Sequence, residues 1–486
     1  MRSSVLFLLS IALLGQTTAP GYFVPTRLIP GIGVARNALS DEALAARTDL
    51  MIQTQTFAIM RDPMAVEGAR RVTTDSKLQS LFRSAAQHSG FPAQTLEAIA
   101  YLESWGDAKA ESPSGPKGIM QVSESTARLM GLSISHATRY HVTRERVQVK
   151  SKSKKPKYKT VTHKTPYTMT VRDDRLNPGR AIPAAAEYLA GMERKFGARD
   201  WAIFAYHCGQ GCAARLLDLT RASSGVPQDQ ATVARMFFSA NPVWNREVYE
   251  TVEREMQRDW SPTYWFRIMR AQQLLALYRS DPREFVSLAQ QYKSEFVSGR
   301  APHRLTVWLS RNDLLFHSGG DIRSALGDRL LVKALDQPDY FGYSLKIQAD
   351  TAVDREDRAK GAPAAIGALL YIAFETRRLY DALVPAGDPF RPLDVVSLVE
   401  PEDYARQLSE REALSHVSGQ VFDIDDSALT PPEIECLRFV LDDLGWAGYL
   451  GFVDETPTTL HIGCAPSARD FFTAVFADAF ATRTAE

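Results

Sequence analysis

Two groups of residues have types and spacings that could support catalysis or metal binding. The first group centres on Glu103. This glutamate completes an apolar helical stripe whose other members, seven, four and three residues before it, are Leu96, Ile99 and Ala100. Residues at this spacing share one helix face, so the carboxyl group is expected on the side that packs inward. Such a carboxyl group favours its neutral form, which can protonate a glycosidic oxygen. The alternative is that Glu103 reaches solvent or pairs with an arginine.

The second group is His416, Asp423 and His461, in the last part of the chain. Two imidazoles and one carboxylate make a suitable zinc site that leaves one coordination position for water. The metal would lower the pKa of that water, and a nearby carboxylate would take its proton. Glu455 is the first candidate for this base and Asp454 is the second. The alternative is that these polar residues only cap strands and turns.

The cysteines and one neighbouring histidine offer a third set of reactive atoms. His207, Cys208 and Cys212 could together bind a metal. In an oxidising compartment, however, a disulfide is the expected state of such thiols. With four cysteines in the chain, we expect Cys208 to pair with Cys212 and Cys436 to pair with Cys464.

The elements around Glu103 are expected to be helices, with one basic interruption. From residue 76 to about 260 the pattern is helical, with Gly and Pro punctuation. Between Arg139 and Arg172 there are eleven Lys and Arg residues and a single acid, Glu145. Polar residues alternate there with apolar or β-branched ones on both sides of "KSKKPK", which predicts a hairpin. Its charge either keeps the strand edges from pairing or contacts a membrane or another anionic polymer.

The length, the charge and the first residues of the chain indicate its number of domains, its partners and its localisation. A chain of 486 residues exceeds one ordinary core, so two or three domains are expected. The 57 basic and 57 acidic residues balance, so nucleic acid is not an expected partner. Residues 1–20 have the layout of a secretory signal, which predicts export to the periplasm or cell envelope. Retention of this segment as an anchor is the alternative, and no other stretch reaches spanning length.

The residues around Glu103 resemble the soluble lytic transglycosylase (SLT) family over roughly residues 80–220. The shared positions, in chain order, are Glu103, Ser104, Ser112, Gly115, Gly118, Ile119, Met120, Gln121, Thr126, Ala127, Ala205, Tyr206, Gly209 and Gly211. The family has a lysozyme-like, mainly helical fold and cuts bacterial peptidoglycan without a cofactor.

This resemblance implies a role for each matching residue. Glu103 would be the single acid and base. It would protonate the oxygen between N-acetylmuramic acid and N-acetylglucosamine, then accept the proton of the muramic C6 hydroxyl as a 1,6-anhydro ring closes. Residues that would line the saccharide site are Ser104, Met120, Gln121 and Tyr206. One departure is His207, where the family usually has Asn.

The second group resembles the zinc D-alanyl-D-alanine carboxypeptidase and dipeptidase family over about residues 365–475. The resemblance rests on Ser415, His416, Gly419, Asp423 and the later His461, and it implies that the two histidines and Asp423 bind zinc. Three positions depart from the family: Glu400 and Ala405 replace an Arg and a Gln, and Leu460 replaces a Trp. Loss of that Arg removes a cation able to hold a substrate carboxylate.

The sequence therefore predicts a mainly α, lysozyme-like domain in residues 76–262, with the basic hairpin inserted at 141–172. A helical connecting region at 263–360 and an α+β zinc-peptidase-like domain at 361–486 would follow. The expected function is peptidoglycan cleavage by a lytic transglycosylase, combined with zinc-dependent stem-peptide cleavage. Alternatives are a non-catalytic wall-binding C-terminal module, a hydrolysing lysozyme-type enzyme, and a non-catalytic envelope scaffold.

Overall fold

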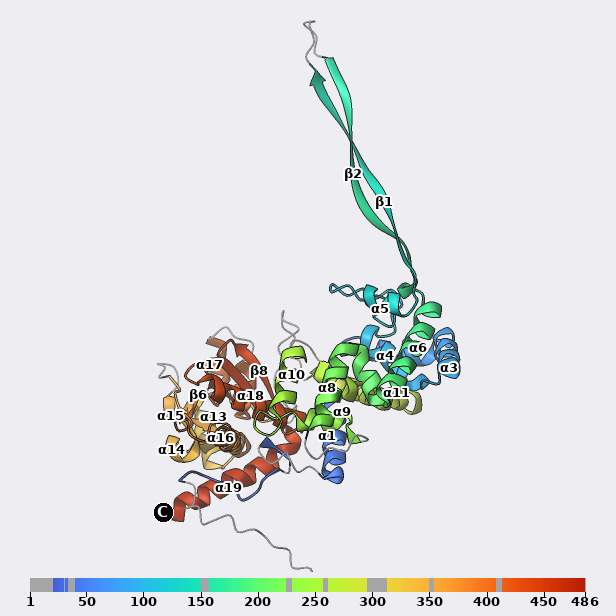
Figure 1. Ribbon diagram of the computed structural model, residues 1–486. Coiled ribbons are helices and arrows are strands. Elements are labelled where there is room, and N and C mark those ends of the chain that lie inside the picture. The colour runs from blue at the N-terminus through green and yellow to red at the C-terminus, as the bar shows by residue number, and fades with distance from the viewer. Residues whose placement is uncertain are drawn as a thin grey trace, which may run out of the picture. The chain divides into compact units, whose positions relative to one another are not determined.

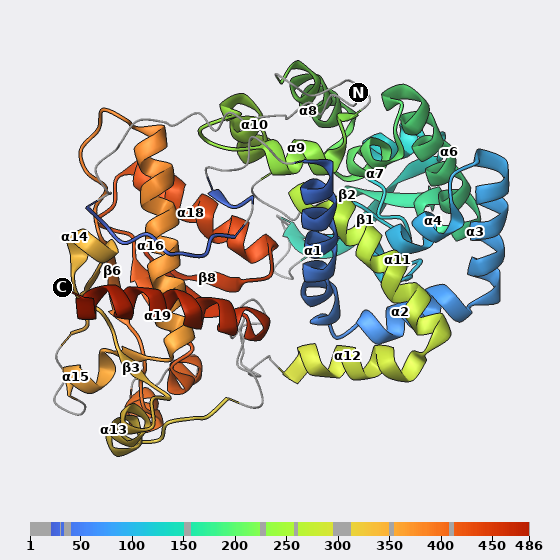
Figure 2. The same ribbon diagram turned by 90° about the horizontal axis from the view of Figure 1, so that it is seen from below.

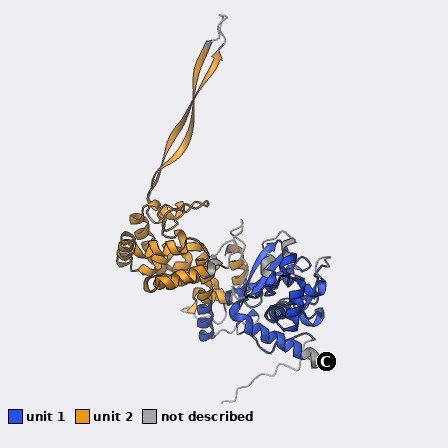
Figure 3. Cartoon of the chain, turned by 180° about the vertical axis from the view of Figure 1, so that it is seen from behind, with its two compact units in different colours: residues 1–50, 241–246, 295–486 blue, residues 51–240, 247–294 orange. Residues whose placement is uncertain are grey.

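The structure is a computed structural model that divides into two compact units. It describes residues 21–29, 31–33, 40–149, 157–223, 230–256, 261–294, 313–348, 354–407 and 413–485. The expected export segment and the 150–156 tip of the basic insertion therefore lie outside the described residues. Unit 1 contains residues 1–50, 241–246 and 295–486, and unit 2 contains residues 51–240 and 247–294 (Figure 3). Within the described ranges, no helix has both the length and the apolar character needed to cross a membrane.

Unit 2 is a bundle of helices with one β-hairpin (Figure 1). Its helices are α2 (Ala65–Thr74), α3 (Ser76–Ser89), α4 (Ala93–Ser104), α5 (Glu124–Leu129), α6 (Pro178–Phe196), α7 (Arg199–Cys208), α8 (Gln210–Ala222), α9 (Val233–Ser239), α11 (Tyr264–Ser280) and α12 (Pro282–Ser294). The short turns η2 (Asp174–Leu176) and η4 (Ser261–Thr263) precede α6 and α11. Helices α1 (Asp41–Met60) and α10 (Arg246–Met256) each begin in unit 1 and end in unit 2.

Helix α4 confirms the helix expected around Glu103. The three apolar members of its stripe have no exposed surface: Leu96, Ile99 and Ala100. The chain leaves the helix at Trp105, whose φ is 52°, and Gly106 follows with a φ of 71°. The N–H of Gly106 donates to the carbonyl of Ala100 at 3.0 Å, which closes the last turn. Helix α11 packs alongside α4 (Figure 2).

The basic insertion forms the expected hairpin. Strands β1 (Ile134–Val149) and β2 (Lys157–Asp173) are antiparallel, and their register runs from Ile134 opposite Asp173 to Val149 opposite Lys157. The register shifts between Ser135 and His136, because β2 has one extra residue there, Val171. At about 3.3 Å per residue the ribbon is about 50 Å long, and it projects from the helices of unit 2 (Figure 1).

Unit 1 is built on a mixed five-stranded sheet in the order β4-β6-β7-β9-β8. The strands are β4 (Tyr343–Leu345), β6 (Leu393–Ser397), β7 (Val421–Asp425), β8 (Leu450–Thr456) and β9 (Thr459–Cys464). Strand β4 is parallel to β6, and every other neighbouring pair is antiparallel. A second, two-stranded sheet joins β3 (Val332–Lys333) to β5 (Lys360–Gly361).

Helices of unit 1 complete an α+β arrangement. The longest, α16 (Pro363–Leu383), is buried along most of its length and packs against α18 (Pro431–Trp446) and α19 (Arg469–Ala485) (Figure 2). The shorter elements are α13 (Gly319–Gly327), α14 (Pro338–Phe341), α15 (Arg355–Arg358), α17 (Glu402–Gln407), η5 (Ala413–Ser418) and η6 (Pro466–Ala468). This mixture agrees with the sequence pattern, although it does not by itself identify a peptidase fold.

The structure divides the chain at other places than the sequence pattern does. Residues 263–360 were expected to connect two domains. Helices α11 and α12 instead belong to unit 2, because the apolar residues of α11, such as Ile268 and Leu275, are buried within it. The described residues from 313 to 360 belong to unit 1, where β4 and β5 join its sheets.

The expected disulfides are absent: all four cysteines, which lie in the described part of the chain, keep their thiols. Cys436 is buried in α18 and Cys464 is buried in β9. The thiol of Cys464 donates to the carbonyl of Ala364 at 3.3 Å. Burial raises the pKa of both the Cys436 and the Cys464 thiol to about 12, so they stay protonated core groups.

Candidate active site

Glu103 lies in the last turn of α4, and its carboxylate is held by one hydrogen bond. The hydroxyl of Tyr264, the first residue of α11, donates to Oε1 of Glu103 at 2.8 Å. Nδ1 of His207 lies 3.8 Å from the same oxygen. The Glu103 side chain is 17% exposed, and no Lys or Arg among the described residues lies within ion-pair distance of it. Glu103 is therefore neither free in solvent nor neutralised by an arginine.

Tyr264 is a part of the site that the sequence pattern did not identify, and the sequence singled out His207 only as a departure from the family's motif and as a possible metal ligand. Their rings stack with centroids 4.5 Å apart and planes 10° from parallel. Tyr264 is 2% exposed. Burial, followed by the charge of Glu103, raises the pKa of its hydroxyl well above the usual value, so Tyr264 remains a donor. No sequence spacing links it to Glu103, because the two residues are 161 positions apart.

Replacing Tyr264 by Phe tests whether this hydrogen bond matters. We expect Tyr264→Phe to lower kcat by about tenfold to a hundredfold, since a hydrogen bond to a charged group contributes about 1.5–3 kcal/mol. The matched control is Tyr278→Phe on the same helix, about 20 Å away at 1.5 Å per residue. Steady-state rates on isolated glycan strands check the prediction. Equal rates for the two variants would contradict it.

The residues expected to line a saccharide site meet at the loop after α4: Ser104 ends α4, Met120 and Gln121 lie in the loop, and Tyr206 comes from α7. Most of their polar atoms contact the protein itself. Ser104 Oγ donates to the carbonyl of Ile119 at 2.8 Å. Tyr206 Oη donates to the carbonyl of Met120 at 2.8 Å. The Gln121 amide donates to the carbonyl of Gly118 at 2.9 Å. Ser104 and the Met120 side chain are buried, so in this structure they shape the loop.

The backbone of this loop is tightly constrained. Gly118 has a φ of 78°, and a Cβ at this position would lie 1.9 Å from the carbonyl oxygen of Arg175. Three non-glycine residues in the described chain have positive φ, and two of them, Trp105 and Gln121, flank the site. Unfavourable backbone conformations of this kind are concentrated at functional sites.

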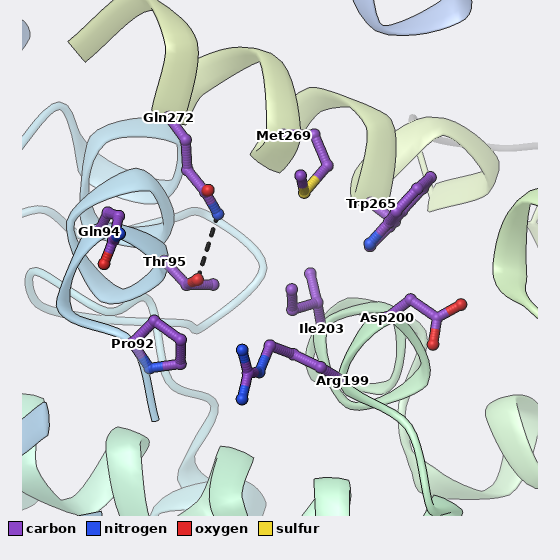
Figure 4. A pocket seen from close by; sticks show the side chains of 9 residues that line it. All are labelled: Pro92, Gln94, Thr95, Arg199, Asp200, Ile203, Trp265, Met269 and Gln272. Carbon is purple, nitrogen blue, oxygen red and sulfur yellow. Dashed lines mark hydrogen bonds between the residues drawn. The ribbon is translucent and has the colours of Figure 1, made fainter. Parts of the chain in front are cut away.

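A pocket of about 320 Å³ lies among the helices that carry the site. Its lining residues, drawn in Figure 4, are Pro92, Gln94, Thr95, Arg199, Asp200, Ile203, Trp265, Met269 and Gln272. They come from α4 and the residue before it, from α7 and from α11. The Gln272 amide donates to Thr95 at 3.1 Å across the pocket (Figure 4). None of the residues predicted from the sequence lines it.

In unit 1 the structure brings together the three predicted metal ligands. Asp423 on β7 pairs directly with His461 on β9, and His416 lies in η5. One ligand atom of each residue lies within 4.8 Å of the others, and all three side chains are buried. His416 Nε2 is 3.1 Å from Asp423 Oδ2, and His461 Nδ1 is 2.7 Å from Asp423 Oδ1.

The chemistry around these residues fits a metal. Nδ1 of His416 forms a hydrogen bond with the carbonyl of Leu398 at 2.6 Å, which leaves its Nε2 facing Asp423. Metal-ligating histidines have this arrangement. Burial opposes the charge of Asp423, but the two histidines hold the pKa of that carboxyl below its usual range. Burial likewise opposes protonation of His416, yet Asp423 raises its pKa to about 9. A metal would take the place of that proton.

The residues expected to complete a peptidase are placed less favourably. Glu455 lies on β8 at the register shift between Asp454 and Thr456, outside the three-residue group. Asp454 pairs with Arg438 at 2.8 Å. Glu400, which stands where the family has an Arg, is buried and accepts a hydrogen bond from Arg358 at 3.3 Å. The guanidinium of Arg358 is thus near the group but already engaged.

Comparison with known proteins identifies the family of the first site. Residues 80–148 and 147–225 match the family model described as "Transglycosylase SLT domain". "Membrane-bound lytic murein transglycosylase F" of Alcanivorax borkumensis is 28% identical over 174 residues, which are 34% of this chain and 29% of that protein. "Peptidoglycan transglycosylase gp16" of Escherichia phage T7 is 31% identical over 137 residues, 28% of this chain and 8% of that protein. The chain thus covers less than a third of either relative.

The two matched segments meet at residues 147–148, inside strand β1 of the hairpin. The match ends at residue 225, so it lends no support to the zinc-peptidase resemblance of residues 365–475. It does confirm the first resemblance, which rested on residues spread from Glu103 to Gly211. Residues 80–225 of this chain are therefore a transglycosylase SLT domain.

Proposed function

We propose that this protein is a peptidoglycan lytic transglycosylase that acts in the cell envelope. The observation that carries the proposal is the surroundings of Glu103: a largely shielded carboxylate with one tyrosine donor and no neutralising cation among the described residues. Both relatives are named for transglycosylase activity on murein or peptidoglycan. The substrate would be the glycan strand, cut between N-acetylmuramic acid and N-acetylglucosamine.

The proposed reaction needs only one carboxyl group. Protonated Glu103 gives its proton to the glycosidic oxygen, and the bond from that oxygen to the muramic C1 breaks. The resulting carboxylate then accepts the C6 hydroxyl proton while O6 bonds to C1, which closes the 1,6-anhydro ring. Hydrolysing glycosidases generally use a pair of carboxylates, whereas the proposed reaction uses Glu103 alone, with Tyr264 and His207 beside its carboxylate. Tyr264 would hold Glu103 in one orientation through both steps.

Digestion of purified sacculi tests this function. The soluble fragments, separated and weighed by mass spectrometry, are expected to end in 1,6-anhydro-muramic acid. Fragments with ordinary reducing ends would instead indicate a hydrolysing, lysozyme-type enzyme. A fragment profile that is the same for the intact protein and for Glu103→Gln would favour the non-catalytic scaffold.

A second activity, zinc-dependent cleavage of the peptide stems, is supported by the convergence of His416, Asp423 and His461. These residues would hold the metal, which when bound would activate a water for attack on a peptide bond. Glu455 would remain the expected base. The buried Glu400 in place of the family's Arg favours the alternative that unit 1 binds the wall without cutting it.

Metal content separates these alternatives. We expect the intact chain to retain zinc after dialysis, and His416→Ala to bind it about 100-fold more weakly or worse. The matched control is His88→Ala, which removes an exposed histidine of α3 and is expected to leave the zinc content unchanged. Elemental analysis of the dialysed proteins gives the answer. An intact chain that retains no zinc yet sediments with sacculi would overturn the peptidase proposal and support the wall-binding module.

A further inference from the structure

Beyond the register shift at its base, one face of the described β-hairpin gathers cations and tyrosines without an acid. In an antiparallel pair, residues directly opposite each other lie on the same face of the ribbon. Arg144 pairs with Thr162, Arg146 pairs with Thr160, and Val142 pairs with Lys164. Arg144, Arg146 and Lys164 are therefore neighbours on one face, which we call the cationic face.

Tyrosines flank these cations on the same face. Tyr140 pairs with Pro166 and is 56% exposed, and Tyr158 pairs with Gln148 and is 51% exposed. The guanidinium of Arg146 lies over the Tyr158 ring, 5.2 Å from its centroid. A cation–π contact of this kind holds a flexible arginine in place. Between the register shift and the described ends of the strands, no Asp or Glu lies on this face; Asp173, opposite Ile134 at the base, is the acid nearest to it in the described hairpin and is ion-paired with Arg175.

The opposite face has a different character. Its cations include Arg139, opposite Tyr167 near the base, and Lys159, opposite Val147 near the tip. Between them lies Glu145, with His163 at 3.7 Å. These cations are thus separated along the ribbon and share their face with an acid. If the charges served only to keep strand edges from pairing, the two faces would not need to differ.

The base of the hairpin is attached to the loop of the candidate active site. Arg175, just after β2, forms a buried ion pair with Asp173 at 2.7 Å. Its Nη1 also donates to the carbonyls of Gly115 and Val122, both at 3.2 Å. These two residues bracket the turn that carries Met120 and Gln121. Arg144 lies ten residues beyond Ile134, about 33 Å along the ribbon. A polymer that extends from the cationic face to the base of the hairpin would therefore reach that loop.

We propose that the cationic face binds the carboxylate-bearing peptide stems of a peptidoglycan strand and so places the glycan beside the SLT site. This inference rests on the proposed function, because it assigns the ribbon the same polymer as Glu103. Arginine binds carboxylates with two parallel hydrogen bonds, and exposed tyrosines present both a ring face and a hydroxyl to sugars and peptides. The attachment of the base to the active-site loop favours this polymer over a lipid bilayer or a nucleic acid.

Two double variants test the face directly. Arg144→Thr with Arg146→Thr removes two charges from the cationic face, and Arg139→Thr with Lys159→Thr removes two from the other. Threonine has a high β-strand propensity, so the hairpin should still form in both variants. Each pair is made in the full chain with Glu103→Gln, and binding to sacculi is measured by sedimentation. We expect the first pair to weaken binding about tenfold or more and the second only slightly. Equal losses, or no loss from the first pair, would overturn the proposal.

Further measurements compare peptidoglycan with other anionic ligands. They also distinguish failure of this proposal from failure of the proposed function. Binding to sacculi is expected to exceed binding to anionic phospholipid vesicles and to DNA at the same salt concentration; the reverse order would overturn the proposal. The variant with Arg144→Thr and Arg146→Thr, but with Glu103 intact, is expected to cleave glycan fragments that are short and free of stems. It should do so at the rate of the unmodified protein. Slower cutting of these fragments would show that the pair damages the SLT site, against this proposal. Failure of the proposed function would look different: the unmodified protein would form no anhydro ends, whatever the sedimentation result.

Discussion

Glu103→Gln is expected to reduce the rate of glycan cleavage by about 10³-fold or more, at the upper part of the range for loss of a general acid or base. The amide has the shape of the carboxyl group but can neither give the first proton nor accept the second. Tyr264 can still donate its hydroxyl hydrogen to the amide oxygen, so the local fold should persist. Single-turnover release of soluble fragments from sacculi measures the rate.

The matched control for this variant is Glu97→Gln on the same helix. Glu97 is buried and accepts hydrogen bonds from Arg279 and, at 2.9 Å, from Gln79. Replacing this carboxylate by an amide should lower stability, since it removes the charge that accepts a hydrogen bond from the exposed Arg279. Cleavage should stay largely intact at a temperature where the variant is folded. If both variants lost cleavage to the same degree, the special role of Glu103 would be refuted.

The largest expected effect on stability is that of Gly118→Ala. The new Cβ would lie 1.9 Å from the carbonyl oxygen of Arg175, a backbone atom that cannot rotate away. The residue would also have to keep a φ of 78°. A positive φ costs about 1–2 kcal/mol for a residue with a side chain, and an overpacked contact costs about 1–3 kcal/mol more. Denaturant unfolding should therefore show a loss of about 3 kcal/mol or more, together with slower cleavage.

Gly90→Ala separates these two contributions. Gly90 ends α3 with a φ of 77°, and a Cβ there would meet no atom within 4 Å. This variant should lose only about 1–2 kcal/mol from the backbone conformation and should cleave glycan at the usual rate. A loss of stability from Gly118→Ala no greater than that from Gly90→Ala would show that the contact with Arg175 is easily relieved.

Helical periodicity was enough to predict where Glu103 lies. The stripe of Leu96, Ile99 and Ala100 determines which face of α4 is buried, and a carboxyl group on that face stands out in any sequence. The hairpin could also be predicted, because alternation of side chains has a period of two and needs no tertiary information. Both are properties of short stretches of chain.

The partners of Glu103 could not be predicted in the same way. Tyr264 and His207 reach it only when α11 packs against both α4 and α7, and packing between distant segments leaves no local pattern. The same reason explains why α11 was expected to connect two domains. The cysteines show the converse error: their number suggested disulfides, but Cys436 and Cys464 are buried individually in the core of unit 1.

The group of His416, Asp423 and His461 in unit 1 could be predicted only in part. The spacing of His416 and Asp423 suggested a site, and the register of β7 against β9 places His461 opposite Asp423. Convergence of the ligand atoms supports metal binding but does not supply a base. Glu455, chosen because it precedes His461, lies on β8 outside the group, so the base remains the least supported part of the proposed peptide cleavage.

Digestion of sacculi in water enriched in heavy oxygen tests the central claim most directly. If Glu103 regains its proton from the sugar's own C6 hydroxyl as O6 bonds to C1, the new glycan ends take no oxygen from solvent. Mass spectrometry should then show unlabelled ends, one water lighter than the products of hydrolysis. Heavy oxygen at the newly formed reducing ends would contradict the account.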